Sequence, residues 1–341
     1  MTNETGRGNR STPDPSKQPS RHRGNRLAWS VGIIAVGTIS IALIATQLIP
    51  STSFASTNPT NCAAAPSKCG LPDATNSGVL AGTVLKTVPA QVSSGPGWTS
   101  TADGSVHVTG NGAVLVGLYI PGTLDITGDN VTVKNVKIVT DGNFGISLRS
   151  IVGVTIQNTI IAGQNADAGR VNYGIDDVSG DSTGMIIKNN DISLARTGIQ
   201  VGSGQITGNY IHDPGYIAGD HTNGIYVNGG TKPMTISGNT IYDPRTQTDA
   251  INLDASGASG QLVANKTVTG NLLAGGGYTV YGGNALAAVT SNIVISNNRF
   301  TTLYYAKSGL YGAGAYFTAA APGSSWSGNI WDATGLAVPA P

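Results

Sequence analysis

The sequence predicts an all-β protein: a right-handed parallel β-helix (solenoid) of about eight to nine coils, preceded by a single transmembrane or signal helix. Three observations support this prediction. The 341 residues include 48 Gly, with only 11% charged and 6% aromatic residues, which is typical of short strands and tight turns. An eight-residue pattern recurs at intervals of 19 to 32 residues. Near the N-terminus, an uncharged stretch of 23 residues follows a basic run.

The N-terminal region divides into two segments. Residues 1–26 are polar, rich in Pro, Ser and Gly, and end in RHRGNR, so we expect a disordered cytoplasmic tail. Residues 27–49 are apolar, uncharged and long enough to span a bilayer, and the preceding basic residues place their N-terminal side in the cytoplasm. The segment Ser53–Ala55 offers a small-residue cleavage site. Two interpretations stay open: a single-pass membrane anchor, or a signal segment cleaved near Ala55 that releases a secreted protein.

Residues 50–99 are expected to form an extracytoplasmic linker and an N-terminal cap. They contain the two cysteines of the chain, Cys62 and Cys69, which are seven residues apart. Both interpretations of the N-terminus place this segment outside the cytoplasm, where thiols are oxidised. The sequence therefore predicts a small disulfide loop between Cys62 and Cys69.

The charge of the extracytoplasmic part excludes some partners. From Ser56 onward the chain has 13 Lys and Arg against 16 Asp, a net charge of about −3. Nucleic acid is therefore not an expected partner, because phosphate binding needs concentrated basic charge. The only Glu of the chain is Glu4, in the tail, so any carboxylate chemistry outside the cytoplasm depends on Asp.

The repeat lies in residues 100–341, the predicted β-helix domain. Each octet has alternating apolar residues, an Asn at the fifth or sixth position, and an apolar eighth residue. The octets are VTVKNVKI (131–138), VTIQNTII (154–161), MIIKNNDI (185–192), GQITGNYI (204–211), MTISGNTI (234–241), KTVTGNLL (266–273), IVISNNRF (293–300) and SSWSGNIW (324–331). A period of this length indicates a solenoid, whereas propeller blades need about 40 residues. We expect the Asn residues to occupy left-handed corners and to form hydrogen-bonded stacks from coil to coil.

A second, shorter strand family lies between the octets and places one apolar residue in each coil. These residues should form one buried stack: Ile146, Ile175, Ile199, Ile225, Ile251 and Val280. Crossovers between parallel strands are almost always right-handed, which sets the expected hand of the helix.

Residues 61–85 (NCAAAPSKCGLPDATNSGVLAGTVL), the octets and DHTNGI (220–225) together resemble bacterial secreted β-helix proteins of the pectate-lyase-like superfamily. The resemblance covers roughly residues 60–335 and implies polysaccharide lyases, hydrolases or epimerases, but also adhesins and binding modules without catalysis. Relatives often read HTDGIQ where this chain has His221, Thr222, Asn223, Gly224, Ile225 and Tyr226. The chain therefore departs from that pattern at Asn223 and Tyr226.

Strand alternation predicts which residues flank the buried stack on the outer surface. The residues before it are small (Gly145, Gly174, Gly198, Gly224, Ala250 and Thr279), and we expect them to form a low floor for a chain-like ligand. Those after it are mostly polar or aromatic, as sugar-binding surfaces are. The predicted substrate-binding residues are Asp176, Gln200, Tyr226, Asn252 and Tyr281.

Titratable residues gather just before two of these strands and in the adjoining turns. The candidate catalytic residues are His221, Asp220, Asp249, His212 and Arg245. The pair Asp220 and His221 occurs in one coil only, so the repeat does not need it. The alternative interpretation is that these residues cap turns, as Asp and Asn commonly do.

The favoured function is a lyase-type enzyme that cleaves an acidic (uronate) polysaccharide by β-elimination. That reaction needs a base, His221 or Arg245, and neutralisation of the uronate by Arg or by Ca²⁺. No cofactor is certain from the sequence; Asp220 and Asp249 are the candidate Ca²⁺ ligands. The alternatives left open are a non-catalytic carbohydrate-binding or adhesin β-helix, a C5-epimerase and a glycoside hydrolase. We expect a monomer with a polysaccharide partner, and membrane contact through residues 27–49 if they are not cleaved.

Overall fold

A computed structural model describes residues 61–255 and 260–341. The predicted tail, the predicted apolar helix at residues 27–49 and the predicted cleavage site near Ala55 lie outside the described residues. No helix in the described part of the chain has the length and hydrophobicity needed to cross a membrane.

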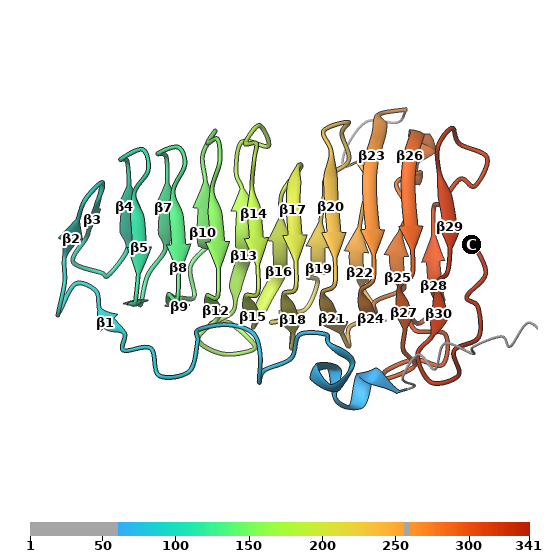
Figure 1. The fold of residues 1–341 in the computed structure, drawn as a ribbon, viewed down its shortest axis with the longest axis horizontal. Helices are drawn as coiled ribbons and strands as arrows, with labels where there is room; N and C mark the ends of the chain where they lie inside the picture. Colours follow the sequence, from blue (N-terminus) through green and yellow to red (C-terminus); the bar gives the residue numbers. More distant parts are fainter. Residues whose placement is uncertain (1–60, 256–259) are drawn as a thin grey trace, which may run out of the picture. The chain divides into compact units, whose positions relative to one another are not determined.

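The described residues form three sheets, which we call A, B and C (Figure 1). Sheet A consists, in spatial order, of β1 (Lys86–Thr87), β6 (Leu118–Ile120), β9 (Lys137–Val139), β12 (Ile160–Ala162), β15 (Asp191–Ser193), β18 (Tyr210–His212), β21 (Thr240–Asp243), β24 (Leu272–Gly275), β27 (Arg299–Phe300) and β30 (Ile330–Trp331).

Sheet B has the longest row of strands and begins with an antiparallel cap of β2, β3 and β4. Its members are β2 (Ser94–Gly95), β3 (Trp98–Ser100), β4 (Val106–Val108), β7 (Leu124–Ile126), β10 (Phe144–Leu148), β13 (Val171–Asp177), β16 (Ala195–Gln200), β19 (Thr222–Tyr226), β22 (Thr248–Asn252), β25 (Tyr278–Tyr281) and β28 (Gly312–Ala315).

Sheet C completes each turn of the chain. Its members are β5 (Val114–Val116), β8 (Thr132–Lys134), β11 (Thr155–Gln157), β14 (Ile186–Lys188), β17 (Gly204–Thr207), β20 (Met234–Ser237), β23 (Leu262–Thr269), β26 (Val289–Ser296) and β29 (Ser325–Ser327). The short 3₁₀ helices are η1 (Cys62–Ala64), η2 (Pro66–Cys69) and η3 (Ala285–Ala287).

The chain passes through sheets B, C and A in turn, and each pass makes one coil. The first coil is β4, β5 and β6, and the ninth is β28, β29 and β30, so the described residues contain nine coils. Every strand pair between coils is parallel. The predicted parallel β-helix of eight to nine coils is therefore confirmed.

The predicted buried stack is also confirmed. Ile146, Ile175, Ile199, Ile225 and Ile251 pair in register along sheet B, and each is fully buried. Val280 continues the row beside Ile251. Equivalent positions superpose because each coil repeats the same path, and this produces one continuous apolar core.

The octets differ from the prediction, because each contains two strands rather than one. In MTISGNTI, β20 covers the first four residues and β21 begins at the seventh. The fifth residue, Gly238, has φ 61°, and the Asn residues at this position in other octets are also left-handed, for example Asn189 with φ 54°. The fifth residue therefore turns the chain from sheet C into sheet A.

The sixth octet residue forms the asparagine stack. Asn190, Asn209, Asn239, Asn271, Asn298 and Asn329 make a buried ladder in which each side-chain amide donates to the next carbonyl oxygen at 2.9–3.0 Å. Each amide also donates to a backbone carbonyl, as Asn239 Nδ2 does to Ile206 O at 3.0 Å. The fifth octet residue thus forms the predicted left-handed corner, and the sixth forms the predicted ladder of asparagine side chains.

The prediction that the small residues before the buried stack form a floor on the outer surface is wrong. A Cβ at Gly145, Gly174, Gly198 or Gly224 would lie 2.3–2.9 Å from the Cγ2 of a buried isoleucine of sheet A. Ala250 and Thr279 are fully buried. These residues face the interior because the chain bends here, so two successive residues point inward. Glycine is needed for close packing between sheets A and B.

Residues 61–87, which we call the strap, cross sheet A from the ninth coil to the first (Figure 1). Ala63 N donates to Asp332 Oδ2 at 3.0 Å in the last coil, and Gly78 N donates to Asn189 O at 2.9 Å in the middle. The strap ends at β1, which pairs with β6 of the first coil. At its start, Cys62 and Cys69 form the predicted disulfide.

Candidate functional site on the outer face of sheet B

The predicted substrate-binding residues form one row on the outer face of sheet B. Register pairs join Asp176 to Gln200, Gln200 to Tyr226, Tyr226 to Asn252, and Asn252 to Tyr281. Each is the residue directly after a member of the buried stack, so alternation turns it outward. Five consecutive coils therefore contribute one side chain each to this row, in which Gln200, Tyr226 and Tyr281 are partly exposed and Asp176 and Asn252 are only 5% and 9% exposed.

A hollow of about 270 Å³, which we call the sheet B pocket, lies over the middle of this surface. It is lined by Tyr173, Arg196, Thr197, Gln200, His221, Asn223, Tyr226, Thr248 and Asn252. Gln200, His221, Tyr226 and Asn252 are residues that the sequence predicted. The lining contains one guanidinium, one imidazole, three amides and several hydroxyls, but no carboxylate.

Arg196 supplies the positive charge of the pocket. Its guanidinium carbon lies 4.7 Å from the centroid of the Tyr173 ring, a cation–π contact. Among residues 61–255 and 260–341 it makes no ion pair, and its buried Nε has no hydrogen-bond partner. A partly buried guanidinium without a carboxylate partner is suited to bind an anionic ligand group.

His221 is exposed at the edge of the pocket. Its Nε2 lies 3.3 Å from Nε2 of Gln247, which comes from the next coil. Asn223 Nδ2 donates to the backbone oxygen of His221 at 3.3 Å. In the described part of the chain no carboxylate pairs with this imidazole, so Asp220, its neighbour in sequence, does not orient the ring.

Asp249 lies beneath the pocket rather than in its lining. Its Oδ2 accepts a hydrogen bond from Asn252 Nδ2 at 2.9 Å, and its Oδ1 is buried without a partner in the described residues. Burial and the nearby Asp243 carboxylate raise the pKa of Asp249 well above its usual value. Asp249 therefore orients Asn252, which does line the pocket.

Asp176 sits beside the pocket, next to Gln200 in the row. It is only 5% exposed, and its Oδ1 is buried with no hydrogen-bond partner among the described residues. Burial and the neighbouring Asp177 raise the pKa of its carboxyl to about 6, although Arg196 and Arg149 oppose the shift.

Three predicted catalytic residues have their interaction partners outside the sheet B pocket. Asp220 forms a two-pronged ion pair with Arg170, with nitrogen–oxygen distances of 2.6 and 2.7 Å, and accepts the Ile217 N–H at 2.8 Å. Arg245 lies over the Tyr216 ring at 4.6 Å and donates its backbone N–H to Asp243. Neither lines the sheet B pocket.

His212 belongs to sheet A, on another face of the coil. It stacks on Tyr210 with ring centroids 4.0 Å apart and contacts Asp191 at 3.0 Å and Asp213 at 2.7 Å. Burial disfavours its charged form, but the two carboxylates outweigh burial and raise the pKa of His212. Its environment is an ion-pair cluster separate from the pocket.

The candidate Ca²⁺ ligands do not form a common site. Asp220 is paired with Arg170, whereas Asp249 is enclosed with Asn252. Within residues 61–255 and 260–341, no group of three or more His, Cys, Asp or Glu side chains is arranged to hold a metal ion.

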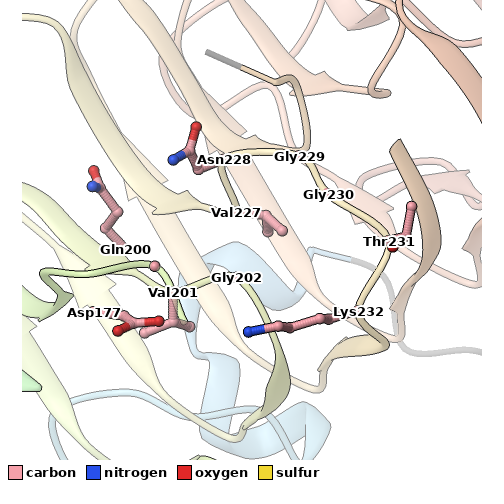
Figure 2. A pocket seen from close by; sticks show the side chains of 11 residues that line it. Asp177, Gln200, Val201, Gly202, Val227, Asn228, Gly229, Gly230, Thr231 and Lys232 are labelled. Atoms are coloured by element: carbon pink, nitrogen blue, oxygen red, sulfur yellow. The ribbon is translucent and has the colours of Figure 1, made fainter. Parts of the chain in front are cut away.

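Two further hollows adjoin sheet B. One, of about 230 Å³, lies where strands leave sheet B, and it shares Gln200 with the sheet B pocket (Figure 2). Its charged residues have protein partners, since Ser182 donates to Asp177 and Lys232 Nζ donates to Asp181 O.

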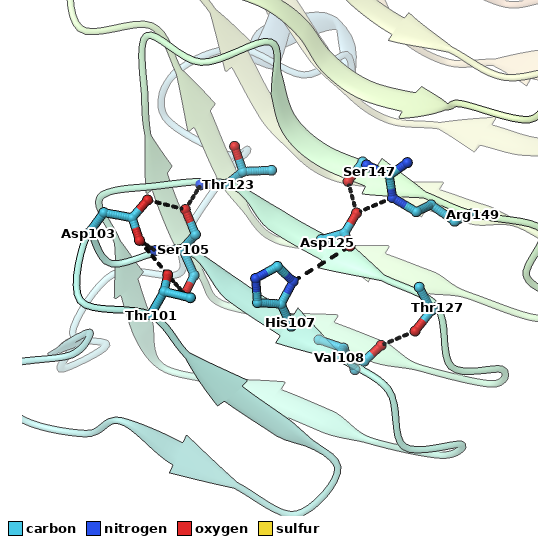
Figure 3. A network of polar contacts seen from close by, with 10 residues as sticks. All are labelled: Thr101, Asp103, Ser105, His107, Val108, Thr123, Asp125, Thr127, Ser147 and Arg149. Carbon is cyan, nitrogen blue, oxygen red and sulfur yellow. Dashed lines mark hydrogen bonds and ion pairs between the residues drawn. The ribbon is translucent and has the colours of Figure 1, made fainter.

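The other hollow, of about 260 Å³, lies over the first three coils (Figure 3). There Asp125 accepts hydrogen bonds from Ser147 Oγ and Arg149 Nε, both at 2.5 Å, and faces His107 Nδ1 at 3.6 Å. These charges satisfy one another, so this network is less suited to bind a charged ligand than Arg196 is.

Sequence reasoning missed Arg196, Tyr173, Thr197, Asn223 and Thr248. By simple alternation Tyr173, Thr197 and Asn223 should point inward, because each lies two residues before a buried isoleucine. The bend at the intervening glycine turns them outward instead. A signal was present in the sequence: Arg196 is a basic residue three positions before Ile199, so alternation alone places it on the outer face.

Comparisons with known proteins agree with the fold. The family described as "Right handed beta helix region" matches residues 173–332, and the parallel sheets extend the same architecture toward the N-terminus. No curated protein and no solved structure matches the chain. The chain is thus a parallel β-helix protein.

Proposed function

We propose that this parallel β-helix protein binds an acidic, uronate-containing polysaccharide on the outer face of sheet B and cleaves it by β-elimination. One observation carries the proposal: Arg196, which has no ion-pair partner among the described residues, lines the same hollow as His221, Tyr226 and three amides. This combination offers a cation for the uronate carboxylate and a base for the adjacent proton. The proposal also places the protein outside the cytoplasm, as the N-terminal sequence predicts.

The chemical step uses groups of the pocket alone. The guanidinium of Arg196 pairs with the uronate carboxylate and stabilises the negative charge that develops when C5 loses its proton. Neutral His221 takes that proton, the electron pair of the C5–H bond forms the C4–C5 double bond, and the C4–O bond breaks. The leaving oxygen takes the proton of the Tyr226 hydroxyl, which also lines the pocket. Gln200, Asn223 and Asn252 bind sugar hydroxyls.

Hydrolysis is less well supported by this geometry. A glycoside hydrolase needs two carboxyl groups on opposite sides of the scissile bond, and the pocket lining contains none. C5-epimerisation begins with the same proton abstraction and remains an alternative outcome of the same site.

Non-catalytic binding is the second candidate. It is favoured by the environment of His221, whose ring has a side-chain amide rather than a carboxylate beside it. A base without an orienting partner is held less firmly in the geometry that proton transfer needs. Binding would then depend on Arg196 and the amides in the same way.

The test is incubation of the full-length protein with a panel of uronate and neutral polysaccharides. We expect ultraviolet absorbance from unsaturated uronates to rise on an acidic polymer only. Arg196→Ala should lower kcat/KM by about 10²-fold or more, and His221→Ala should lower kcat by about 10²–10⁴-fold with little change in melting temperature.

The control is Arg149→Ala, since Arg149 is paired with Asp125 outside the pocket. Reducing ends without unsaturated products would indicate hydrolysis. Exchange of the C5 hydrogen with solvent deuterium, without cleavage, would indicate epimerisation. Binding that depends on Arg196 without any reaction would indicate a binding module.

A further inference from the structure

We propose that four tyrosines, Tyr278, Tyr281, Tyr311 and Tyr316, form a stacking subsite for pyranose rings of the bound polysaccharide. We call this group the tyrosine platform. It lies beyond the sheet B pocket, over the last two coils, and it rests on the proposed function of that pocket. The platform would hold the chain by ring faces rather than by charge.

The four rings form one contiguous cluster. Ring centroids are 5.9 Å apart for Tyr278 and Tyr281, 5.6 Å for Tyr278 and Tyr311, and 5.3 Å for Tyr281 and Tyr316. Tyr311 is 60% exposed and Tyr316 is 50% exposed. The rings are tilted or perpendicular to one another, so parts of several faces stay open to solvent.

The platform continues the row that crosses the pocket. Tyr281 of β25 is the register neighbour of Asn252, which lines the pocket. Tyr278 leans over the next strand, where its ring lies 3.4 Å from the position of a Cβ on Gly312, within van der Waals contact. A ligand that occupies the pocket and extends toward the C-terminal coils meets the tyrosines directly.

The backbone at Tyr316 gives an independent reason to assign a function to the platform. Tyr316 has φ 54°, a left-handed conformation that is uncommon for a bulky residue and costs about 1–3 kcal/mol. Its carbonyl oxygen accepts the Asn284 N–H at 2.8 Å, so the backbone path is fixed. Glycine would adopt this conformation without strain. A half-exposed tyrosine therefore stands where glycine would be less strained, which is consistent with use of the ring.

The chemistry of the platform favours sugars. Tyrosine offers an apolar face for C–H groups and a hydroxyl for hydrogen bonds, which suits an amphipathic ligand. The platform has no basic residue among its four members, so it contacts ring faces while Arg196 binds a carboxylate. The outer row advances by three coils from β16, which carries Arg196, to β25, a distance of about 14 Å at the strand spacing. Only a ligand of several sugar units spans both.

The experiment measures binding of oligouronates from dimers to octamers, and of matched neutral oligosaccharides, by calorimetry on the full-length protein. The variants are Tyr311→Ala, Tyr316→Phe, Tyr316→Gly and the double Tyr311→Ala/Tyr316→Gly. Tyr119→Ala is the control, since Tyr119 lies on sheet A beside Lys137. We expect the double variant to raise the Kd of octamers at least tenfold and to leave the Kd of dimers unchanged.

Tyr316→Gly separates binding from structure. Because it relieves a left-handed backbone, it should unfold at a higher temperature than the wild type and yet bind octamers more weakly. Tyr316→Phe should keep most of the affinity, because it keeps the ring. If the double variant binds octamers as the wild type does, the platform has no role in binding and the inference is overturned.

The platform and the pocket can fail separately. Arg196→Ala that loses affinity for every acidic ligand, with platform variants unchanged, would retain the proposed function and reject the platform. Platform variants that lose octamer affinity while Arg196→Ala binds normally would reject the role of the pocket. If the wild type binds neither acidic nor neutral oligosaccharides, both proposals are wrong.

Discussion

At the scale of single residues, Asp243 is a buried carboxylate whose hydrogen bonds do not offset its burial. Thr222 Oγ1 and the Arg245 N–H donate to it, yet burial raises the pKa of Asp243 to about 7, above the value of 3.8 for a free side chain. A carboxyl with a raised pKa holds its proton more tightly in the folded state. Its contribution to the free energy of unfolding is therefore fully present below about pH 4 and is lost as the pH rises through 7.

Asp243→Asn should remove this pH dependence. Between pH 5 and 7.5 the free energy of unfolding of the wild type should fall more than that of the variant, by on the order of 2 kcal/mol. Denaturant unfolding at both pH values measures the difference. The exposed Asp141→Asn should behave like the wild type. Parallel profiles for Asp243→Asn and the wild type would contradict the assignment.

Individual residues show what sequence reasoning could predict about the site. Gln200, Tyr226 and Asn252 were predicted because alternation around a buried isoleucine is a local rule. The pairing of Asp220 with Arg170 was not predictable, since the two residues are 50 positions apart in the sequence and lie in different coils. Arg196 was missed because the short strand read from the sequence around Ile199 began at Thr197, whereas β16 begins at Ala195 and carries Arg196.

At the scale of the strand, the glycines before the buried stack set how closely sheets A and B approach. A Cβ at Gly224 would lie 2.3 Å from Ile241 Cγ2 and 2.5 Å from Ala250 O. In the next coil Ala250 is accepted, and there sheet A carries Leu273 in place of Ile241. Leucine has no methyl branch at Cβ, which leaves room for the alanine.

Gly224→Ala should therefore destabilise the protein by about 1–3 kcal/mol through overpacking. Gly202→Ala is the matched control, because no atom lies closer than 3.9 Å to the Cβ it would gain. Thermal unfolding of both variants checks the expectation. Equal melting temperatures for the two would show that the corner between sheets A and B can widen without cost.

The sequence predicted the number and the period of the coils, but it did not predict all strand boundaries. The buried stack and the coil count follow from periodicity alone. The division of each octet into two strands does not follow from periodicity. The apolar residues on the two sides of the corner alternate as they would in one straight strand, so the corner leaves no trace in the pattern. The left-handed residue at the fifth position is what separates β20 from β21.

At the scale of the whole solenoid, the strap joins the last coil to the first. Asp332 is 1% exposed and binds three groups: Arg299 Nε at 2.7 Å, the Ala63 N–H at 3.0 Å and, through its backbone oxygen, the Asn61 N–H at 3.0 Å. Tyr242 and Leu272 of sheet A pack beneath the disulfide-bonded start of the strap. The strap was not predictable from the sequence, since its contacts span as many as 269 positions.

Asp332→Ala should release the start of the strap. The variant removes the side-chain acceptor of the Ala63 N–H and the 2.7 Å ion pair with Arg299, a change that costs about 1–3 kcal/mol. We expect faster proteolysis within residues 61–80 and a lower melting temperature. The exposed Asp141→Ala should change neither. Protection of residues 61–80 equal to that of the wild type would mean that the disulfide loop and Tyr242 suffice to hold the strap.

The contacts of the strap also determine the order in which parts of the molecule fold. Coils of a solenoid can form one after another, since each contacts only its neighbours. The segment around Cys62, however, is synthesised before every coil and docks beside Asp332, which is synthesised near the end. The earliest part of the domain therefore reaches its native position last. A chain that stops short of the ninth coil leaves this segment undocked and accessible to proteases, so docking of the strap reports that the ninth coil has formed.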